Sequence, residues 1–207
     1  MKFKSMALLM LTMAMPAMAD QVTVNTQEVS LVLDVENGQP DKYLHFGARL
    51  DERDKANLSV TANGRMDVYP AYGLNTPAES ALALRHADGN MSTALVATGY
   101  DSRQEANATV TVIHLKDAVY PVKVDLCYRA YKDVDLIEAW SEITNEEKGT
   151  VTLTTFASAM LPIRRGNVWM SHLSGTWASE GYVNNELLTP GEFVIRNADG
   201  TRNSHTD

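Results

Sequence analysis

Strict alternation of apolar and polar side chains is the feature that most constrains how this chain can fold. In the ten residues Val122–Tyr131 (VKVDLCYRAY) every even position is apolar, and charged residues hold three of the odd positions. A period of two places alternate side chains on opposite faces of a strand. A sustained 3.6-residue period, which would indicate an amphipathic helix, occurs in no window of the chain. The pattern predicts an all-β protein whose strands bury one face.

Short segments rich in β-branched residues carry the same signature along the rest of the chain and are separated by turn residues. They are 28–35, 43–48, 81–85, 92–99, 108–115, 135–145, 150–157, 167–173, 176–180 and 192–196. We expect 81–85 and 92–99 to form a hairpin across Asp88-Gly89-Asn90. About ten short strands at this spacing predict two packed antiparallel sheets, a β-sandwich.

The first nineteen residues read as a secretory signal peptide. Lys2 and Lys4 precede the charge-free apolar stretch 6–15, and Ala17-Met18-Ala19 follows as a small-x-small cleavage site. The stretch is too short to span a bilayer as a mature helix, although an uncleaved anchor or a first strand is the alternative interpretation. We therefore expect residues 1–19 to be removed, and residues 20–207 to form one exported domain, periplasmic or secreted.

Charge and cysteine content narrow the class of partner. The chain has 18 basic and 26 acidic side chains, a net charge of −8, and loss of Lys2 and Lys4 would make the balance more acidic. Such a surface repels phosphate backbones, which argues against nucleic acid and anionic membranes as partners.

Cys127 is the single cysteine, so an intramolecular disulfide is impossible. Its place on the second face of an alternating strand indicates a small packed residue rather than a nucleophile.

Motifs for catalysis, metal binding or cofactor binding are scarce. The sequence contains no Gly-rich phosphate loop, no GxSxG and no HExxH. Its five histidines are far apart in sequence and none has a histidine or cysteine at i+2 or i+4 that would suggest a metal site, so we expect neither a metal site nor a cofactor. Asp133 and Asp135 could serve as a hydrolase pair, but two acids at a turn are usually solvated turn residues. We therefore expect no catalytic residue in this chain.

Aromatic residues beside glycine and proline give the better functional lead. Sugar sites combine flat apolar faces with polar groups that hold hydroxyls, and two segments offer that mixture. Asp67, Tyr69 and Tyr72 lie in 67–73, and Trp177 lies in 172–180. These four residues are the candidate sugar-binding residues. The alternative is that the aromatic rings pack in the core or in an interface.

The ordered series of segments resembles the N-terminal domain of glycoside hydrolase family 36 α-galactosidases from about residue 29 to residue 201. The segments that carry the resemblance are 69–73 (YPAYG), 81–89 (ALALRHADG), 113–117 (IHLKD), 120–128 (YPVKVDLCY), 135–145 (DLIEAWSEITN), 173–180 (LSGTWASE) and Gly200-Thr201. The order of the whole series is more specific than any one of its pieces.

The resemblance implies an all-β supersandwich that precedes a (β/α)8 barrel. In that family the barrel holds an aspartate nucleophile and an aspartate acid/base, and the enzyme retains anomeric configuration. It further implies an α-galactoside oligosaccharide substrate, packing on the protein's own C-terminal catalytic barrel, and a homo-oligomer. Loop residues of 67–73, and Trp177 less directly, would extend to the sugar site. Many members carry an Asp and an Arg where this chain has Thr76 and Ala78, so raffinose-type specificity and the usual tetramer are not carried over.

Two other interpretations fit the residues. A free-standing glycan-binding module would present its aromatic residues as an exposed platform without any barrel. A structural or adhesion domain without a ligand would instead bury Tyr72 and Trp177. The exposure of these two rings separates the alternatives.

Overall fold

The computed structural model describes residues 20–58, 66–73, 79–161, 166–176 and 178–195. The chain forms two compact units, Met1–Pro162 and Ile163–Asp207. The proposed signal peptide, Trp177 and the departures at Thr76 and Ala78 lie outside the described residues. Strands dominate what is described, and every strand pair between the named strands is antiparallel. The predicted all-β class is confirmed.

The largest sheet of the first unit runs in the order β5-β6-β7-β8. Its strands are β5 Leu95–Gln104, β6 Ala108–Asp117, β7 Val122–Tyr131 and β8 Ile137–Asn145. Strand β7 has the bounds that its alternation predicts, and its even positions are buried in the core. Sequence neighbours pair throughout this sheet, as expected for a meander with short connections.

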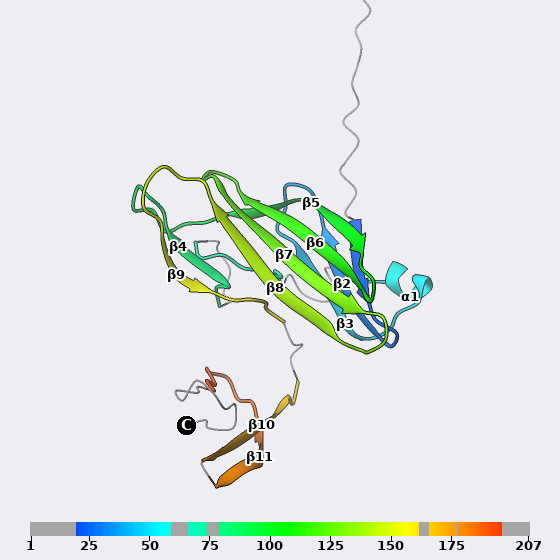
Figure 1. Cartoon of the computed structure of the whole chain (residues 1–207). Coiled ribbons are helices and arrows are strands. Elements are labelled where there is room, and N and C mark those ends of the chain that lie inside the picture. Colours follow the sequence, from blue (N-terminus) through cyan, green and yellow to red (C-terminus); the bar gives the residue numbers. More distant parts are fainter. Residues whose placement is uncertain (1–19, 59–65, 74–78, 162–165, 177, 196–207) are drawn as a thin grey trace, which may run out of the picture. The chain divides into compact units, whose positions relative to one another are not determined.

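A three-stranded sheet of the order β1-β2-β3 contributes the opposite side of the core (Figure 1). Its strands are β1 Asp20–Asn25, β2 Val29–Val35 and β3 Lys42–Ala48. Leu31 and Leu33 of β2 share one buried cluster with Ile113 of β6 and Val124 of β7. The short helix α1, Glu52–Ala56, follows β3, and the side chain of Asp51 caps its N-terminus. It buries none of its own residues, in accord with the missing apolar stripe.

A third, two-stranded sheet pairs β4 Leu82–Arg85 with β9 Thr152–Phe156 beside one end of the large sheet (Figure 1). The hairpin expected between 81–85 and 92–99 is therefore wrong, because β4 pairs with β9 and β5 pairs with β6. The chain does turn at Asp88-Gly89-Asn90, where the Gly89 N–H donates to the His86 carbonyl. A turn signal fixes a reversal of the chain, but the strand partner is decided by tertiary packing.

The outward face of the large sheet carries charged side chains over a small apolar cluster. Arg129 donates to Glu138 at 2.8 Å and to Glu105 at 3.2 Å, and its guanidinium lies 5.2 Å from the Trp140 ring centroid. Cys127 is only 3% exposed beneath this layer, and burial raises its pKa to about 11. The prediction of a small packed residue is confirmed.

The second unit contains the hairpin of β10 Trp169–Thr176 and β11 Ser179–Leu187. The strand expected at 192–196 is wrong for its described part, since residues 192–195 have no regular structure. His172 of β10 lies against Phe193, with ring centroids 5.7 Å apart. Over the described residues of both units, no helix has the length and apolarity to cross a bilayer.

Candidate functional site

Tyr72 is held by its backbone and presents its ring to solvent. Its N–H donates to the Leu82 carbonyl at 2.8 Å, and its carbonyl accepts from the Thr93 N–H at 2.9 Å. The residue is 49% exposed although Ala71 beside it is buried. Because the backbone at Tyr72 is already ordered, a ligand that meets its ring does not have to order this loop.

Gly73 allows this loop to lie directly on the segment that contains Ser92. Its φ is +96°, a conformation that residues with a Cβ rarely adopt. A Cβ built on Gly73 would stand 2.5 Å from the Ser92 Cα. The Tyr72-Gly73 turn therefore depends on glycine both for its backbone conformation and for its contact.

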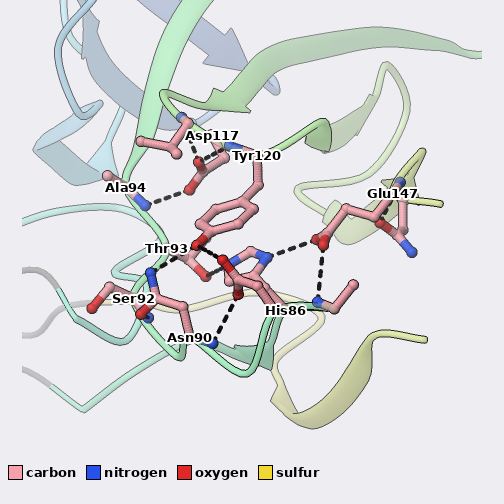
Figure 2. Close-up of polar contacts among 12 residues, drawn as sticks. His86, Asn90, Ser92, Thr93, Ala94, Asp117, Tyr120 and Glu147 are labelled. Carbon is pink, nitrogen blue, oxygen red and sulfur yellow. Dashed lines mark hydrogen bonds and ion pairs between the residues drawn. The ribbon is translucent and has the colours of Figure 1, made fainter. Parts of the chain in front are cut away.

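A buried histidine, His86, binds Thr93 (Figure 2), the residue whose N–H donates to the Tyr72 carbonyl. His86 is 2% exposed, its Nδ1 lies 2.7 Å from Glu147 Oε1, and its Nε2 lies 3.0 Å from Thr93 Oγ1. Its ring stacks on Tyr120 with centroids 3.6 Å apart and planes inclined by 11°. The hydrogen bond from His86 is the main cause that lowers the pKa of Glu147, and the Ala87 N–H bonded to the same carboxylate acts in the same direction.

The hydroxyl of Tyr120 extends this network to the turn after β4. It donates to Asp88 Oδ2 at 2.8 Å and accepts from Asn90 Nδ2 at 2.8 Å. Bonds from the Asn90 N–H first and the Tyr120 hydroxyl second lower the pKa of Asp88. Asp117, at the end of β6, accepts from the Ala94 N–H at 2.6 Å and so joins β6 to the segment after β4. The loops after β4, β6 and β8 are thus joined by hydrogen bonds, and Thr93 in the first of them bonds to the Tyr72 carbonyl.

Sequence reasoning treated His86 only as one of five scattered histidines and missed this network. A histidine directly before the Ala-Asp-Gly turn of a strand end was the available signal, because a turn can bring a side chain back over its own strand. The partners Tyr120 and Glu147 stand 34 and 61 residues away in sequence. No local pattern links them to His86.

The other predicted sugar residues are engaged inside the protein. Asp67 forms an ion pair with Lys42 of β3. Tyr69 is 3% exposed, and its hydroxyl donates to the Ala157 carbonyl at 2.8 Å. Burial is the main cause that raises the pKa of Tyr69. Of the four candidates, the described residues therefore offer Tyr72 alone to a ligand, while Trp177 lies outside them.

Carboxylates are present on the described surface but serve structural contacts. His114 lies between Asp125, at 2.7 Å from its Nδ1, and Asp101, at 3.0 Å from its Nε2, on the outward face of the large sheet. The hydrogen bond with Asp125 is the main cause that raises the pKa of His114. Asp135 is exposed in a turn, as expected, and its Oδ1 also accepts from Thr26 Oγ1 and from the Glu28 N–H, both at 2.8 Å. The described residues contain no group of three or more side chains suited to a metal ion.

A cavity of about 350 Å³ lies between the two larger sheets of the first unit. Its walls come from four strands, β2, β3, β7 and β8, and from three segments, at Val68, 135–136 and 159–161. The lining residues are Val29, Leu31, Leu33, Tyr43, Phe46, Val68, Tyr128, Asp135, Leu136, Ile137, Ala139, Ala159, Met160 and Leu161. Asp135 is the one charged residue among them, and its carboxylate already holds the two bonds given above. A sugar site needs convergent polar groups, so this apolar cavity does not suit a saccharide.

Comparison with known proteins gives a consistent set of relatives. The model of the glycosyl hydrolase family 36 N-terminal domain matches residues 40–207. Probable alpha-galactosidase C of Aspergillus terreus is 23% identical over 182 residues, which cover 77% of this chain and 24% of the relative. Alpha-galactosidase 2 of Pediococcus pentosaceus is 26% identical over 147 residues, which cover 64% of this chain and 20% of the relative. The chain thus spans about a quarter of the length of the curated relatives it matches.

Solved structures support the same fold. The alpha-galactosidase AgaA of Geobacillus stearothermophilus superposes with a TM-score of 0.77 at 17% identity, covering 89% of this chain and 30% of that one. The alpha-galactosidase of Lactobacillus brevis gives a TM-score of 0.69 at 19% identity, covering 84% of this chain and 28% of that one. Forms of the Geobacillus protein have also been solved in complex with raffinose and with stachyose.

Proposed function

This chain belongs to the glycosyl hydrolase family 36 N-terminal domain family, and on that premise we propose that it is the non-catalytic first domain of an exported α-galactosidase. The whole enzyme would hydrolyse terminal α-D-galactosyl residues of galacto-oligosaccharides with retention of configuration. The observation that carries the proposal is that the family match extends over residues 40–207 while the chain covers only 24% of an α-galactosidase relative. Catalysis is assigned to the polypeptide that the relatives have and this domain does not match.

The chemistry of the described residues supports a non-catalytic role. A retaining glycosidase needs two carboxyl groups about 5 Å apart on either side of the scissile bond. Asp101 and Asp125 both bind His114 on an outward sheet face, and Asp135 accepts two hydrogen bonds from the turn after β1. These acids hold structure and leave no space for a glycosidic bond between them.

We assign the exposed ring of Tyr72 a supporting role at the rim of the sugar site of the complete enzyme. Its backbone is fixed on both sides and its ring is half exposed, which suits stacking against a sugar. Packing of this domain on the catalytic barrel would bring the ring to the site. Export is proposed from the signal-peptide pattern of residues 1–19.

The proposal is tested by comparing the full-length protein with the fragment 20–207. We expect the full-length protein to release p-nitrophenol from p-nitrophenyl α-galactoside, with the α-anomer of galactose as first product in proton NMR. The folded fragment should show no turnover above buffer, because no carboxylate pair among its described residues is placed on either side of a site for a glycosidic bond. Turnover by the fragment, or its absence in the full-length protein across α- and β-galactosides, would refute the assignment. The mature N-terminus of the exported protein is expected at Asp20.

The glycan-binding module is the second candidate, and the exposure of Tyr72 is the observation that favours it. A module of that kind would bind galacto-oligosaccharides as the fragment alone, whereas a rim residue acts only beside the barrel. Titration of the fragment with raffinose by calorimetry separates the two. Measurable heat of binding that disappears in Tyr72→Ala would favour the module.

A further inference from the structure

The edge strand β5 is divided in two by a bulge before Gly99. The register of β5 with β6 shifts between Ala97 and Gly99, and a bulge of this kind leaves one residue unpaired and bends the strand. The inner half is held on both sides, because Ala97 also bonds through its backbone to Gly38 and Gln39. The outer half, residues 100–104, is exposed throughout. We therefore expect the outer half to open more readily than the inner half, since few buried contacts hold it.

The side chain of His114 on β6 connects this outer half to the middle of the sheet. Its Nε2 lies 3.0 Å from Oδ2 of Asp101, which stands on β5 beyond the bulge. Its Nδ1 lies 2.7 Å from Oδ1 of Asp125 on β7. The ring therefore bridges three strands, with a carboxylate at each of its two nitrogens.

The number of protons on the ring decides whether both contacts can be hydrogen bonds. A cationic imidazole donates from both nitrogens, whereas the neutral ring has one N–H and one lone pair. In the neutral ring, the lone pair would face a carboxylate, and the two would repel each other. Asp125 is the closer partner and its side chain is 39% exposed, whereas that of Asp101 is 85% exposed. We therefore expect the loss of one proton to release Asp101 rather than Asp125.

The other titratable side chains on this face of the sheet come from all four strands. They are Arg103 of β5, Lys116 of β6, Lys123, Cys127 and Arg129 of β7, and Glu138 and Glu142 of β8. Histidine is the one side-chain type that ordinarily changes its charge between about pH 5 and pH 8, and burial raises the pKa of Cys127 to about 11. The charge of this face near neutral pH therefore depends on His114.

The two carboxylates favour the cationic form of the ring. The hydrogen bond with Asp125 is the main cause that raises the pKa of His114 above its ordinary value of 6.5; partial desolvation opposes it, and the bond with Asp101 acts in the same direction as the first. Because the folded pKa lies above the unfolded one, the stabilisation from the bridge is complete below about pH 6.5. It is lost as the pH rises through the folded pKa.

We propose that His114 is a pH-dependent clasp, which holds the outer half of β5 on the sheet while both ring nitrogens are protonated and releases Asp101 when one proton leaves. The clasp does not depend on the reaction of the complete enzyme. It gives a conformational role to a residue on the outward face of the large sheet, apart from the Tyr72 loop. The result is an edge strand whose outer half is closely paired in mild acid and opens more often above neutral pH.

Hydrogen–deuterium exchange of the full-length protein, read by mass spectrometry of its peptides, tests the clasp. Wild type and His114→Gln are compared with each other at pH 6 and again at pH 8, so that the intrinsic effect of pH on exchange cancels. At pH 6 we expect about threefold lower protection of residues 100–104 in His114→Gln, a size typical of an exposed ion pair. At pH 8 the two proteins should agree, because the wild-type ring has then lost its second proton. Protection of β8, residues 137–145, should be equal in both proteins.

Two further variants separate the charge of the ring from its packing. His45→Gln is the matched control, since His45 Nε2 lies 3.0 Å from the Ala48 carbonyl rather than from a carboxylate, and it should match wild type at residues 100–104. Asp101→Asn removes the outer partner and should lower protection at pH 6 as much as His114→Gln does.

Equal protection of residues 100–104 in wild type and His114→Gln at pH 6 would overturn the proposal. A difference of the same size at pH 6 and pH 8 would overturn it as well, because it would arise from packing of the ring and not from its charge. Unaltered protection in Asp101→Asn would show that the outer contact holds nothing. A loss that extends equally over residues 137–145 would indicate general destabilisation of the sheet in place of a clasp on β5.

Discussion

Tyr72 differs from the other tyrosine of its segment because the fold uses Tyr69 internally and leaves Tyr72 at the surface. If its ring stacks on the sugar in the full-length enzyme, we expect Tyr72→Ala to lower kcat/KM about tenfold, equivalent to roughly 1.4 kcal/mol. Michaelis–Menten kinetics on raffinose measure the effect. Tyr100→Ala is the matched control, since Tyr100 is 42% exposed on β5. Equal kcat/KM for wild type and Tyr72→Ala would remove Tyr72 from the sugar site.

Asp41 gives the domain an unusual dependence of stability on pH. It is 2% exposed, its Oδ2 has no hydrogen-bond partner among the described residues, and burial raises its pKa to about 7. Because the folded pKa lies above the unfolded value of 3.8, the folded state binds the proton more tightly. Its contribution to stability is greatest below about pH 4, falls as pH rises towards 7, and then stays constant.

We expect Asp41→Asn to remove that loss of stability, which amounts to roughly 4 kcal/mol between pH 4 and pH 8. Urea unfolding at a series of pH values measures it. Asp135→Asn is the control with the opposite sign, since the Glu28 N–H and then the Thr26 hydroxyl lower the Asp135 pKa. The Asp135 contribution is present above pH 3.8 and is lost as pH falls. A wild-type slope that persists in Asp41→Asn would show that another group causes it.

At the scale of elements, the loops after β3 and β4 meet at Gly73. We expect Gly73→Ala to destabilise the domain by about 3 kcal/mol, because positive φ and a steric contact with Ser92 add together. Gly89→Ala isolates the first effect, since Gly89 has φ +90° but nothing within 4 Å of its Cβ position. Gly89→Ala should lower the free energy of unfolding by only about 1 kcal/mol. Urea unfolding of both variants checks the difference, and similar values would show that the contact with Ser92 relaxes freely.

The sequence predicted individual strands better than their partners. The alternation in Val122–Tyr131 and the β-branched residues of 108–115 located β7 and β6, because a period of two is a local property. The predicted pairing of 81–85 with 92–99 was wrong. Strand β4 pairs with β9, which lies about 70 residues later, and no local pattern marks that pairing. Strand β1, Asp20–Asn25, was missed altogether, because its six residues directly follow the signal-peptide pattern.

At the scale of the whole molecule, the family could be predicted, but the structural role of each aromatic residue could not. Tyr69 and Tyr72 stand three positions apart in the same motif, and only tertiary contacts decide that one donates to Ala157 and the other faces solvent. The apolar cavity was equally invisible, since its walls come from four strands and three separate segments. Long-range geometry, rather than residue type, determines these features.

Cys127 lies under the charged layer of β7 with a thiol pKa near 11. Until β6, β7 and β8 have paired, this thiol is open to oxidants, and the export proposed above would place the protein in an oxidising compartment. Once that sheet forms, the sulfur is neither accessible nor ionised, and oxidation requires the sheet to open again. Whether β6, β7 and β8 pair before an oxidant arrives therefore decides whether this cysteine stays reduced.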